Sequence, residues 1–245
     1  MHIHPPKPLH GWREFLGEVG IIVLGILIAL GCEQLVETAH WHHKVEQATN
    51  SLARAIRDNA IQAAEQQVVA PCVDRQLALL EQRLIAPGPY RAATLYRDKT
   101  PIAYTVRAPS RGWDDSTWRI VTTEGVATHL PDTLRGQVDS IYQMLATLNT
   151  QAEHSDTALW RLNSLALPIF ADPAARARVV QDIEEMRGRQ ALMTLVAGQM
   201  LGTVKAAGML PSAADFQKEV FARSGTVAFC RAHRLPLDAV RALSS

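Results

Sequence analysis

Side chains of the types used in catalysis or metal binding lie in two short runs. Glu37 and His40 stand three residues apart, the spacing of metal ligands in di-iron helical bundles, but such bundles need two of these pairs and this chain has one. The run Glu153–Asp156 reads Glu-His-Ser-Asp. Adjacent helical residues point in different directions, so these side chains cannot form a triad. We therefore expect no enzyme, no metal site and no cofactor.

One stretch has the composition of a ligand-binding site. Residues 111–118 read Arg-Gly-Trp-Asp-Asp-Ser-Thr-Trp and lead from a loop into a helix. The candidate ligand-binding residues are Arg111, Trp113, Asp115 and Trp118, which would line a small pocket. In the alternative interpretation the two tryptophans fill the end of a helical bundle, while Asp114 or Asp115 caps a helix.

Composition and charge restrict the class of protein. The formal net charge is +1 over 245 residues and no basic block is present, which argues against nucleic acid as a partner. Hydrophobic residues make up 47% and aromatic residues 6%, while Ala, Leu, Gln and Arg are abundant, which favours helix. We expect an all-α fold in which an N-terminal transmembrane helix continues into an antiparallel helical bundle.

The most apolar part of the chain is Val19–Cys32, which contains no charged residue. The helical pattern extends it to Phe15–Val36, with a glutamate near each end. That length matches the roughly 20 apolar residues of a spanning helix. Trp12 and Trp41 would stand about 44 Å apart along a helix, close to the thickness of a bilayer with its interfaces. The lipid bilayer is therefore an expected partner.

Two alternatives involve processing of this segment. A secretory signal would need a small-x-small cleavage site after the apolar run, and none is evident. Leu30-Gly31-Cys32 is similar to a lipoprotein cleavage box, but Ala29 stands where such boxes usually carry leucine. A membrane-spanning helix is the interpretation that fits better.

The start of the span carries a family resemblance. It reads Phe15-Leu16-Gly17-Glu18-Val19-Gly20-Ile21-Ile22-Val23-Leu24-Gly25-Ile26-Leu27-Ile28-Ala29-Leu30. This resembles the N-terminal segment of an uncharacterised family of bacterial single-pass membrane proteins, in which a Gly-Glu pair precedes an apolar run ending Gly-Ile-Leu-Ile-Ala-Leu. Ser116–Trp118 followed by Gly125 is similar to a second feature of that family. The resemblance implies a membrane-anchored helical protein and supplies no catalytic residues.

The resemblance is partial. Members of the family often continue with Gln and an Asn-Trp-Asn tripeptide; this chain has Gln34 and Trp41 but not the tripeptide. The match covers about a third of the chain.

The chain is expected to divide into three parts. These are a short tail at 1–11, the transmembrane helix with interfacial ends at 12–41, and an extramembrane helical domain at 42–245. Lys7 and Arg13 precede the span, so the positive-inside rule predicts a cytoplasmic N-terminus. The C-terminal domain would then lie in the periplasm, with the span in a bacterial inner membrane.

One face of the span carries small residues. Glu18, Ile22, Gly25 and Ala29 fall along this face, and small residues allow two helices to approach closely. This pattern predicts a homo-oligomer.

Three cysteines are present, and one of them, Cys32, lies in the span. Cys72 and Cys230 lie far apart in the predicted domain, where they would form a disulfide outside the cytoplasm. The alternative is two unrelated buried thiols.

The helices before residue 90 are expected to be separated by prolines. The chain has no proline from Trp12 to Val69, so the anchor helix should run on until Pro71 ends it. A second, short helix is expected over Cys72–Ile85, followed by the breaker Ala-Pro-Gly-Pro at 86–89.

The middle of the chain is expected to be less regular. Tyr90–Pro109 is the least helical stretch, with a short strand where Ile102, Tyr104 and Val106 alternate. The next helix should begin at Asp114 or Asp115 and end at Gly125.

The two longest helices carry apolar residues at alternating steps of four and three, which is typical of coiled-coil packing. The first row holds Leu134, Val138, Ile141, Leu145, Leu148, Ala152, Leu159 and Leu162, and the second Val179, Ile183, Met186, Met193, Ala197, Met200 and Val204. Pro168–Pro173 should connect them, with Asp172 as N-cap. A short connection predicts an antiparallel hairpin with arms of about 50 Å.

Two more helices are expected near the C-terminus. Ser212 and Asp215 form a capping-box pattern, and Gly225 interrupts the helix that follows. Leu235-Pro236 should begin a final short helix. The whole pattern favours a tethered binding, sensory or scaffolding module for an unknown protein partner. A homo-oligomeric spacer is the near alternative, and a metal-binding or enzymatic helical bundle the distant one.

Overall fold

The structure is a computed structural model that describes residues 11–97, 103–110, 112–167 and 172–240, without the side chains of Glu14 and Pro173. The expected all-α fold is confirmed, since 78% of the structure is helical. The chain divides into two compact units, residues 1–49 and residues 50–245. The sequence-based boundary after residue 41 therefore falls inside the first unit.

The first unit consists mainly of the beginning of helix α1 (Trp12–Ile85). This part is long and apolar enough to cross a membrane, with a mean hydropathy of 2.4 over its most apolar window. None of that window is buried. The four residues of the predicted oligomer face, Glu18, Ile22, Gly25 and Ala29, are exposed, as are the neighbouring apolar side chains.

Helix α1 does not end at Pro71, so the prediction of two separate helices is wrong. Proline lacks the N–H that would bond to Gln67 O, and a proline inside an isolated helix costs about 3 kcal/mol. Here the inner side of the turn around it is packed, because Val68, Val69, Cys72 and Val73 are fully buried. Tertiary burial therefore outweighs the local effect of proline.

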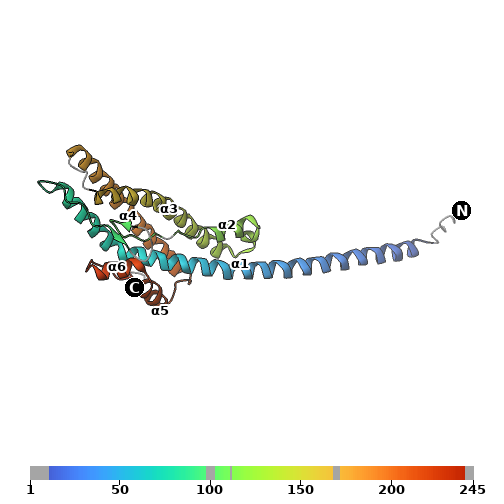
Figure 1. The fold of residues 1–245 in the computed structure, drawn as a ribbon. Coiled ribbons are helices and arrows are strands. Elements are labelled where there is room, and N and C mark those ends of the chain that lie inside the picture. The colour runs from blue at the N-terminus through green and yellow to red at the C-terminus, as the bar shows by residue number, and fades with distance from the viewer. Residues whose placement is uncertain (1–10, 98–102, 111, 168–171, 241–245) are drawn as a thin grey trace. The chain divides into compact units, whose positions relative to one another are not determined.

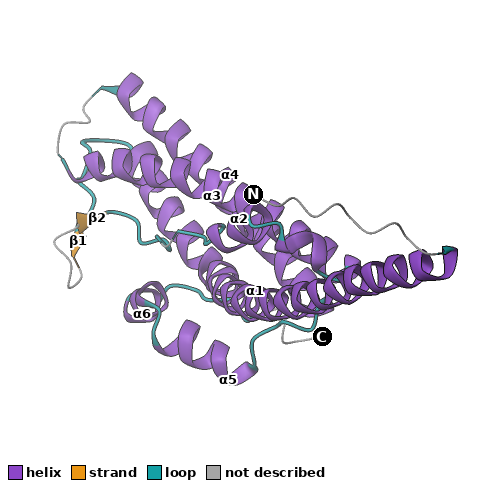
Figure 2. Ribbon diagram, turned by 90° about the vertical axis from the view of Figure 1, so that its right-hand side faces the viewer, coloured by secondary structure: helices purple, strands orange, loops and turns teal. Residues whose placement is uncertain are grey.

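Within the second unit, α1 is the central helix. Figures 1 and 2 both place it between the pair α3 (Asp132–Leu162) and α4 (Pro173–Ala206) on one side and the segment α5 (Ala213–Phe216) to α6 (Gly225–Ala232) on the other. Every residue from Asn59 to Val69 is buried. A helix that is surrounded in this way must bury its polar residues as well as its apolar ones.

Helices α3 and α4 form the predicted antiparallel hairpin. Arg161 Nη1 lies 3.8 Å from Asp182 Oδ1, and Ser155 Oγ lies 3.8 Å from Met193 Sδ. Residue numbers therefore fall along α3 as they rise along α4, which makes the two helices antiparallel. Asp172 caps α4 by accepting hydrogen bonds from Ala174 N and Ala175 N, as expected. The 3-10 helix η2 (Asn163–Ala166) follows α3 directly. The predicted connection over Pro168–Pro173 lies mostly outside the described residues.

A short hairpin and a short helix precede α3. Strands β1 (Tyr96–Arg97) and β2 (Ala103–Tyr104) pair antiparallel, close to the predicted strand. Helix α2 (Ser116–Thr123) is followed by Gly125, whose φ of 74° is accessible to glycine at little cost. The 3-10 helix η1 (Val126–His129) then leads into α3.

The C-terminal segment begins with the predicted capping box, in which Ser212 and Asp215 exchange hydrogen bonds at the start of α5. A π-helical stretch, η3 (Gln217–Ala222), joins α5 to α6. The predicted final helix at Leu235 is wrong for the described residues, because 235–240 is not helical. That stretch is instead held against α1, where Asp238 N donates to Val68 O over 2.9 Å.

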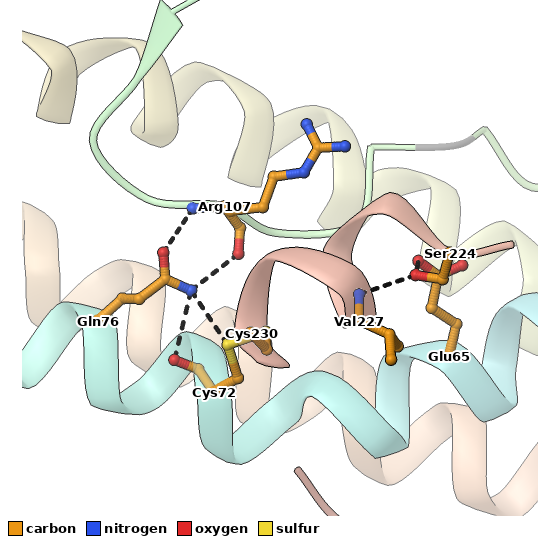
Figure 3. Close-up of a disulfide and its surroundings, with 7 residues drawn as sticks. All are labelled: Glu65, Cys72, Gln76, Arg107, Ser224, Val227 and Cys230. Carbon is orange, nitrogen blue, oxygen red and sulfur yellow. Dashed lines mark hydrogen bonds between the residues drawn. A yellow bond between two sulfur atoms is a disulfide. The ribbon is translucent and has the colours of Figure 1, made fainter. Parts of the chain in front are cut away.

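Helix α6 is fastened to α1 at both of its ends (Figure 3). Cys230 is bonded to Cys72, with 6.1 Å between their Cα atoms. Ser224, the N-cap of α6, accepts from Val227 N and donates to Glu65 Oε1 over 2.7 Å. The sequence left open whether the two cysteines pair; in the structure they do, next to Pro71.

Candidate functional site

The segment 103–110 is held in place by side-chain amides from the helices beside it. Asn163 Oδ1 accepts from Thr105 N over 2.9 Å, and Asn163 Nδ2 donates to Ala103 O over 3.0 Å. In the same way Gln76 Oε1 accepts from Arg107 N over 2.7 Å, and its Nε2 donates to Arg107 O over 3.0 Å (Figure 3). These amides satisfy peptide groups that neither helix nor strand pairs.

Two asparagines fix the other end of this connection. Asn149 Oδ1 accepts from Trp113 N over 3.1 Å, and Asn149 Nδ2 donates to Trp113 O over 3.1 Å. Asn59 pairs in both directions with the peptide of Asp114, over 3.0 and 2.8 Å. The backbone around Trp113 is therefore held between α1 and α3, and the position of its indole is determined by helices far away in the sequence.

A polar cavity of about 160 Å³ lies where this connection meets α1, α3 and α4. Amide, hydroxyl and carboxylate groups make up much of its wall. The lining residues are Gln62, Gln66, Pro109, Ser110, Gly112, Trp113, Asn149, Ala152, Glu153, Ser155, Asp156, Leu159, Gln190 and Met193. A cavity with a few convergent polar groups is the usual form of a small-molecule site, so we regard it as the candidate functional site.

The inner wall of the cavity is polar and buried. Gln66 Nε2 donates to Gln190 Oε1 over 2.8 Å, and these side chains are 1% and 8% exposed. This hydrogen bond uses one donor of Gln66 and the oxygen of Gln190, so the Gln66 oxygen and the Gln190 N–H groups keep hydrogen-bonding capacity. Ser155, which is also buried, directs its hydroxyl to Met193 Sδ.

Two carboxylates form the outer part of the wall. Glu153 and Asp156 are both exposed residues, one helical turn apart on α3. Partial burial raises the pKa of Asp156 above its ordinary value. Among the lining residues that the structure describes, these two carboxylates are the charged side chains.

The predicted ligand-binding residues do not converge on one pocket. Trp113 lines the cavity and is 5% exposed, whereas Asp115 forms an ion pair with Arg119 over 2.9 Å. Trp118 stacks on Tyr142, with 6.0 Å between ring centroids. The remaining candidate, Arg111, lies outside the described residues. Of the three described candidates, Trp113 lines the cavity and the other two do not.

In the alternative interpretation Asp114 or Asp115 caps a helix, and the structure divides this role between the two residues. Asp115 is the N-cap residue of α2 by position but makes no side-chain cap bond. Asp114 Oδ1 accepts from Ser116 N over 2.9 Å and from Ser116 Oγ over 2.6 Å. The bond from the Ser116 hydroxyl is the main reason that the pKa of Asp114 lies below its usual value. Asp114 thus holds the start of α2, and the adjacent Trp113 packs inside.

The amides Gln62, Gln66 and Gln190 were not identified as site residues from the sequence. The stretch 59–67 carries a signal that could have identified them. Its Asn, Gln, Ala and single Glu residues place a polar or small side chain on every face of the helix. A surface helix shows a charged face instead. A helix with this pattern is one that other elements surround.

A larger groove of about 880 Å³ follows α1 and α4 past Pro71. Gln190 belongs to the walls of both the groove and the cavity. Arg187 lies in the groove wall, and its guanidinium contacts three carboxylates, those of Asp74, Glu81 and Glu184. That end of the groove is occupied by an ion-pair network that joins α1 to α4.

The turn of α1 that holds Glu37 and His40 shows no metal site. Among the residues that the structure describes, no group of three or more His, Cys, Asp or Glu side chains is placed to hold an ion. His40 instead contacts the Trp41 ring edge-on, with 6.0 Å between centroids, and Lys44 lies over the same indole at 5.5 Å.

Comparisons with models of protein families, with curated proteins and with solved structures find no match for this chain.

Proposed function

We propose that this protein is a single-pass bacterial inner-membrane protein whose helical domain binds a ligand or partner, as a sensory or scaffolding module. The observation that carries the proposal is the apolar part of α1, which is long enough to cross a membrane and has no buried residue in its most apolar window. Apolar side chains from Phe15 to Val36 are between about a third and three quarters exposed, as the extremes of Val19 at 37% and Ile21 at 74% illustrate. Lipid removes the free-energy cost of exposing such a surface to water.

The disulfide supports a location for the domain. Disulfides form and persist in oxidising compartments such as the bacterial periplasm and are rare in the cytosol. The pair Cys72–Cys230 lies in the second unit, and Lys7 and Arg13 precede the apolar segment. Both features favour a cytoplasmic N-terminus and a periplasmic domain.

The cavity supports a binding role rather than catalysis. Its buried polar groups are the amides of Gln66 and Gln190, which contact each other, together with the Ser155 hydroxyl and the Trp113 indole. Such groups fix the orientation of a ligand, and they are weak nucleophiles and weak bases. The cavity also lies against three helices of the domain, so a ligand there would change contacts that hold the helices together. That arrangement suits a sensor, in which ligand binding shifts a conformational equilibrium.

A homo-oligomeric spacer is the second candidate. The face that contains Gly25 and Ala29 is exposed on α1, and small residues at that spacing let two membrane helices approach. Cross-linking in membranes tests it: a dimer that Gly25→Leu abolishes would support the spacer, and no dimer would exclude it. Such a dimer is compatible with ligand binding by the other unit.

The experiment for the main proposal uses the full chain in bacterial cells. Membranes are separated and washed with alkaline carbonate, which removes peripheral proteins. Alkaline phosphatase fused after Ser245 reports the side of the membrane, because this enzyme is active only outside the cytoplasm. We expect the chain in the washed membranes with an active fusion. Recovery of the chain in the soluble fraction, or an inactive fusion at normal abundance, would refute the proposal.

A further inference from the structure

Positive charge is concentrated in two stretches of the second unit. Residues 82–97 and residues 225–237 together contain five arginines, and neither stretch contains an aspartate or a glutamate. The arginines are Arg83, Arg91, Arg97, Arg231 and Arg234. The formal net charge of the whole chain is only +1, so these charges are balanced elsewhere in the molecule.

Contacts between aromatic rings bring the two stretches together. Tyr96 of strand β1 lies against two rings of the second stretch, with 5.0 Å between its centroid and that of Phe229 and 4.9 Å to that of His233. Arg97 follows Tyr96 directly, and Arg234 follows His233 directly. The five arginines therefore belong to one region of the domain, which we call the basic surface.

The beginning of the first stretch is held to the same region. Arg83 Nη1 donates to Ala92 O over 3.1 Å, which places the end of α1 beside the loop that leads to β1. That bond engages only part of the guanidinium group, which carries several N–H donors. All five arginines are exposed residues, so their remaining donors can reach a partner.

The charge of the basic surface is not neutralised within the part of the chain that the structure describes. None of the five arginines forms an ion pair there, in contrast to Arg187, which contacts three carboxylates. The described acidic residues that border the two stretches lie elsewhere, since Glu81 pairs with Arg187 and Asp238 lines the groove beside α4. A negatively charged partner would relieve the repulsion among these like charges.

Exposed aliphatic side chains occur in the same region. Ile85, the last residue of α1, is 66% exposed, and Leu95 is 43% exposed. Interfaces between proteins combine apolar contacts with arginine, which is enriched in them. The planar guanidinium group also matches a carboxylate through two parallel hydrogen bonds. A partner that carries carboxylates and apolar side chains together therefore fits this surface.

The position of the basic surface favours a protein over the lipids around the anchor. Helix α1 enters the second unit at Asn50 and ends at Ile85, so about 50 Å of helix separates the two residues. The surface lies beside the last part of α1, because Cys230 of α6 is bonded to Cys72. It is thus far from the point at which α1 enters the unit.

We propose that the basic surface binds an acidic segment of a protein partner, in which aspartate or glutamate residues are interspersed with apolar ones. This inference rests on the proposed function and deepens it, since it names the class of partner for the helical domain. The carboxylates of the segment pair with Arg91, Arg97 and Arg234, and its apolar side chains contact Ile85 and Leu95.

The test uses the full chain in nanodiscs of phosphatidylcholine, a lipid without net charge. The probe is a short fluorescein-labelled peptide with the repeat Glu-Glu-Leu, and its control is a peptide of the same length with the repeat Gln-Gln-Leu. Fluorescence anisotropy gives the dissociation constants. We expect the acidic peptide to bind at least about tenfold more tightly than its control. Its dissociation constant should rise at least about tenfold from about 0.05 M to about 0.5 M NaCl.

Two double variants locate the binding site on the domain. Arg91→Gln combined with Arg97→Gln should weaken binding of the acidic peptide about tenfold, since each exposed ion pair contributes about a few-fold. Arg54→Gln combined with Arg119→Gln is the matched control, because it removes the same charge from the same unit outside the basic surface. It should change the dissociation constant by less than about twofold. All four residues are exposed, so folding limits neither arm, and circular dichroism verifies this.

The outcomes separate this inference from the proposed function. Equal binding of the two peptides would exclude a carboxylate partner, and equal weakening by the two double variants would show that binding reports net charge instead of this surface. Tighter binding to vesicles of phosphatidylglycerol than to the acidic peptide would assign the surface to anionic lipid. In each of these cases a chain that stays in washed membranes with an active phosphatase fusion keeps the proposed function. Binding that only the Arg91 and Arg97 substitutions weaken would support the inference.

Discussion

The Ser224 hydroxyl donates a hydrogen bond of 2.7 Å to the Glu65 carboxylate, inside the domain and across 159 residues of sequence. Both residues are buried, at 2% and 3% exposure. The contact places the start of α6 against the central helix α1. Glu65 stands seven residues before Cys72, which bonds to the end of α6. One short helix is thus held by a buried polar contact and a covalent bond.

Ser224→Ala should destabilise the domain more than an ordinary cap mutation. It removes the cap of α6 and leaves the buried Glu65 carboxylate without this donor, so we expect a loss of about 2–4 kcal/mol in the free energy of unfolding. Ser212→Ala is the matched control, because that cap is exposed and its loss should cost about 1 kcal/mol. Urea unfolding in detergent followed by circular dichroism measures both. Equal losses would show that the Glu65 contact adds nothing.

Cys230→Ser should lower the free energy of unfolding by about 2–5 kcal/mol, because the bond to Cys72 closes a long loop of the unfolded chain. The reduced wild-type protein should behave like the mutant. Cys32→Ser is the control, since Cys32 is exposed and free. Denaturant melts with and without a reducing agent measure the difference. A reducing agent that leaves the wild-type midpoint unchanged, after complete reduction, would contradict the prediction.

Asn59→Leu should release the peptide of Asp114 from α1. Leucine has a similar volume but cannot exchange the two hydrogen bonds that Asn59 makes with this peptide. We expect faster amide hydrogen exchange over residues 112–115, measured by mass spectrometry of peptides. Gln143→Leu, which removes an exposed bond to Asp139 on α3, should leave that stretch unchanged. Unaltered exchange in Asn59→Leu would mean that other contacts hold this connection.

Two glycines of α4 should respond differently to alanine. A Cβ on Gly202 meets no atom within 4 Å, so Gly202→Ala should raise the free energy of unfolding by about 0.5–1 kcal/mol. A Cβ on Gly198 would stand 2.7 Å from Nε2 of Gln67, whose side chain is buried against α4. The free energy of unfolding of Gly198→Ala should therefore be at least about 1 kcal/mol lower than that of Gly202→Ala. Thermal and urea melts of the two variants decide this, and equal stabilisation would show that Gln67 moves aside freely.

The domain should lose stability in alkali through Tyr142. Burial raises the pKa of Tyr142 to about 12, compared with about 10 for an unfolded tyrosine. The folded state therefore binds the phenol proton more tightly than the unfolded state does. The contribution of Tyr142 to the free energy of unfolding is complete below pH of about 10 and is lost as the pH rises through about 12. Tyr142→Phe should flatten the pH dependence of stability above pH of about 10. A difference between wild type and mutant that stays constant with pH would contradict this.

Several helix ends were predictable because their signals are local. The cap at Asp172, the capping box of Ser212 and Asp215, and the stop at Gly125 each depend on residues within one or two turns. The apolar rows of α3 and α4 likewise predicted an antiparallel pair. The local rules failed at Pro71, where burial of the neighbouring turn keeps the helix intact.

The candidate site was only partly predictable. Trp113 was identified because it lies in the stretch 111–118, which combines aromatic and charged residues. Gln66 and Gln190 were not identified, because a glutamine in the sequence gives no sign of whether it lies on the surface or in the core. What distinguishes them is a partner 124 residues away. Asp115 and Trp118 were grouped with Trp113 by closeness in sequence, yet they form contacts within α2 and with α3.

By itself the sequence determined the all-α class, the apolar segment at the start of α1 and the periodicity that pairs α3 with α4, because each of these follows from the order of residues over a few turns. Only the tertiary structure decided that α1 passes through Pro71, that Cys72 meets Cys230 and that the amides of Gln66 and Gln190 enclose a cavity. The physical reason is that the free energy of burying a helical turn, a disulfide or an amide depends on which atoms surround it, and those atoms come from elements far apart in the chain.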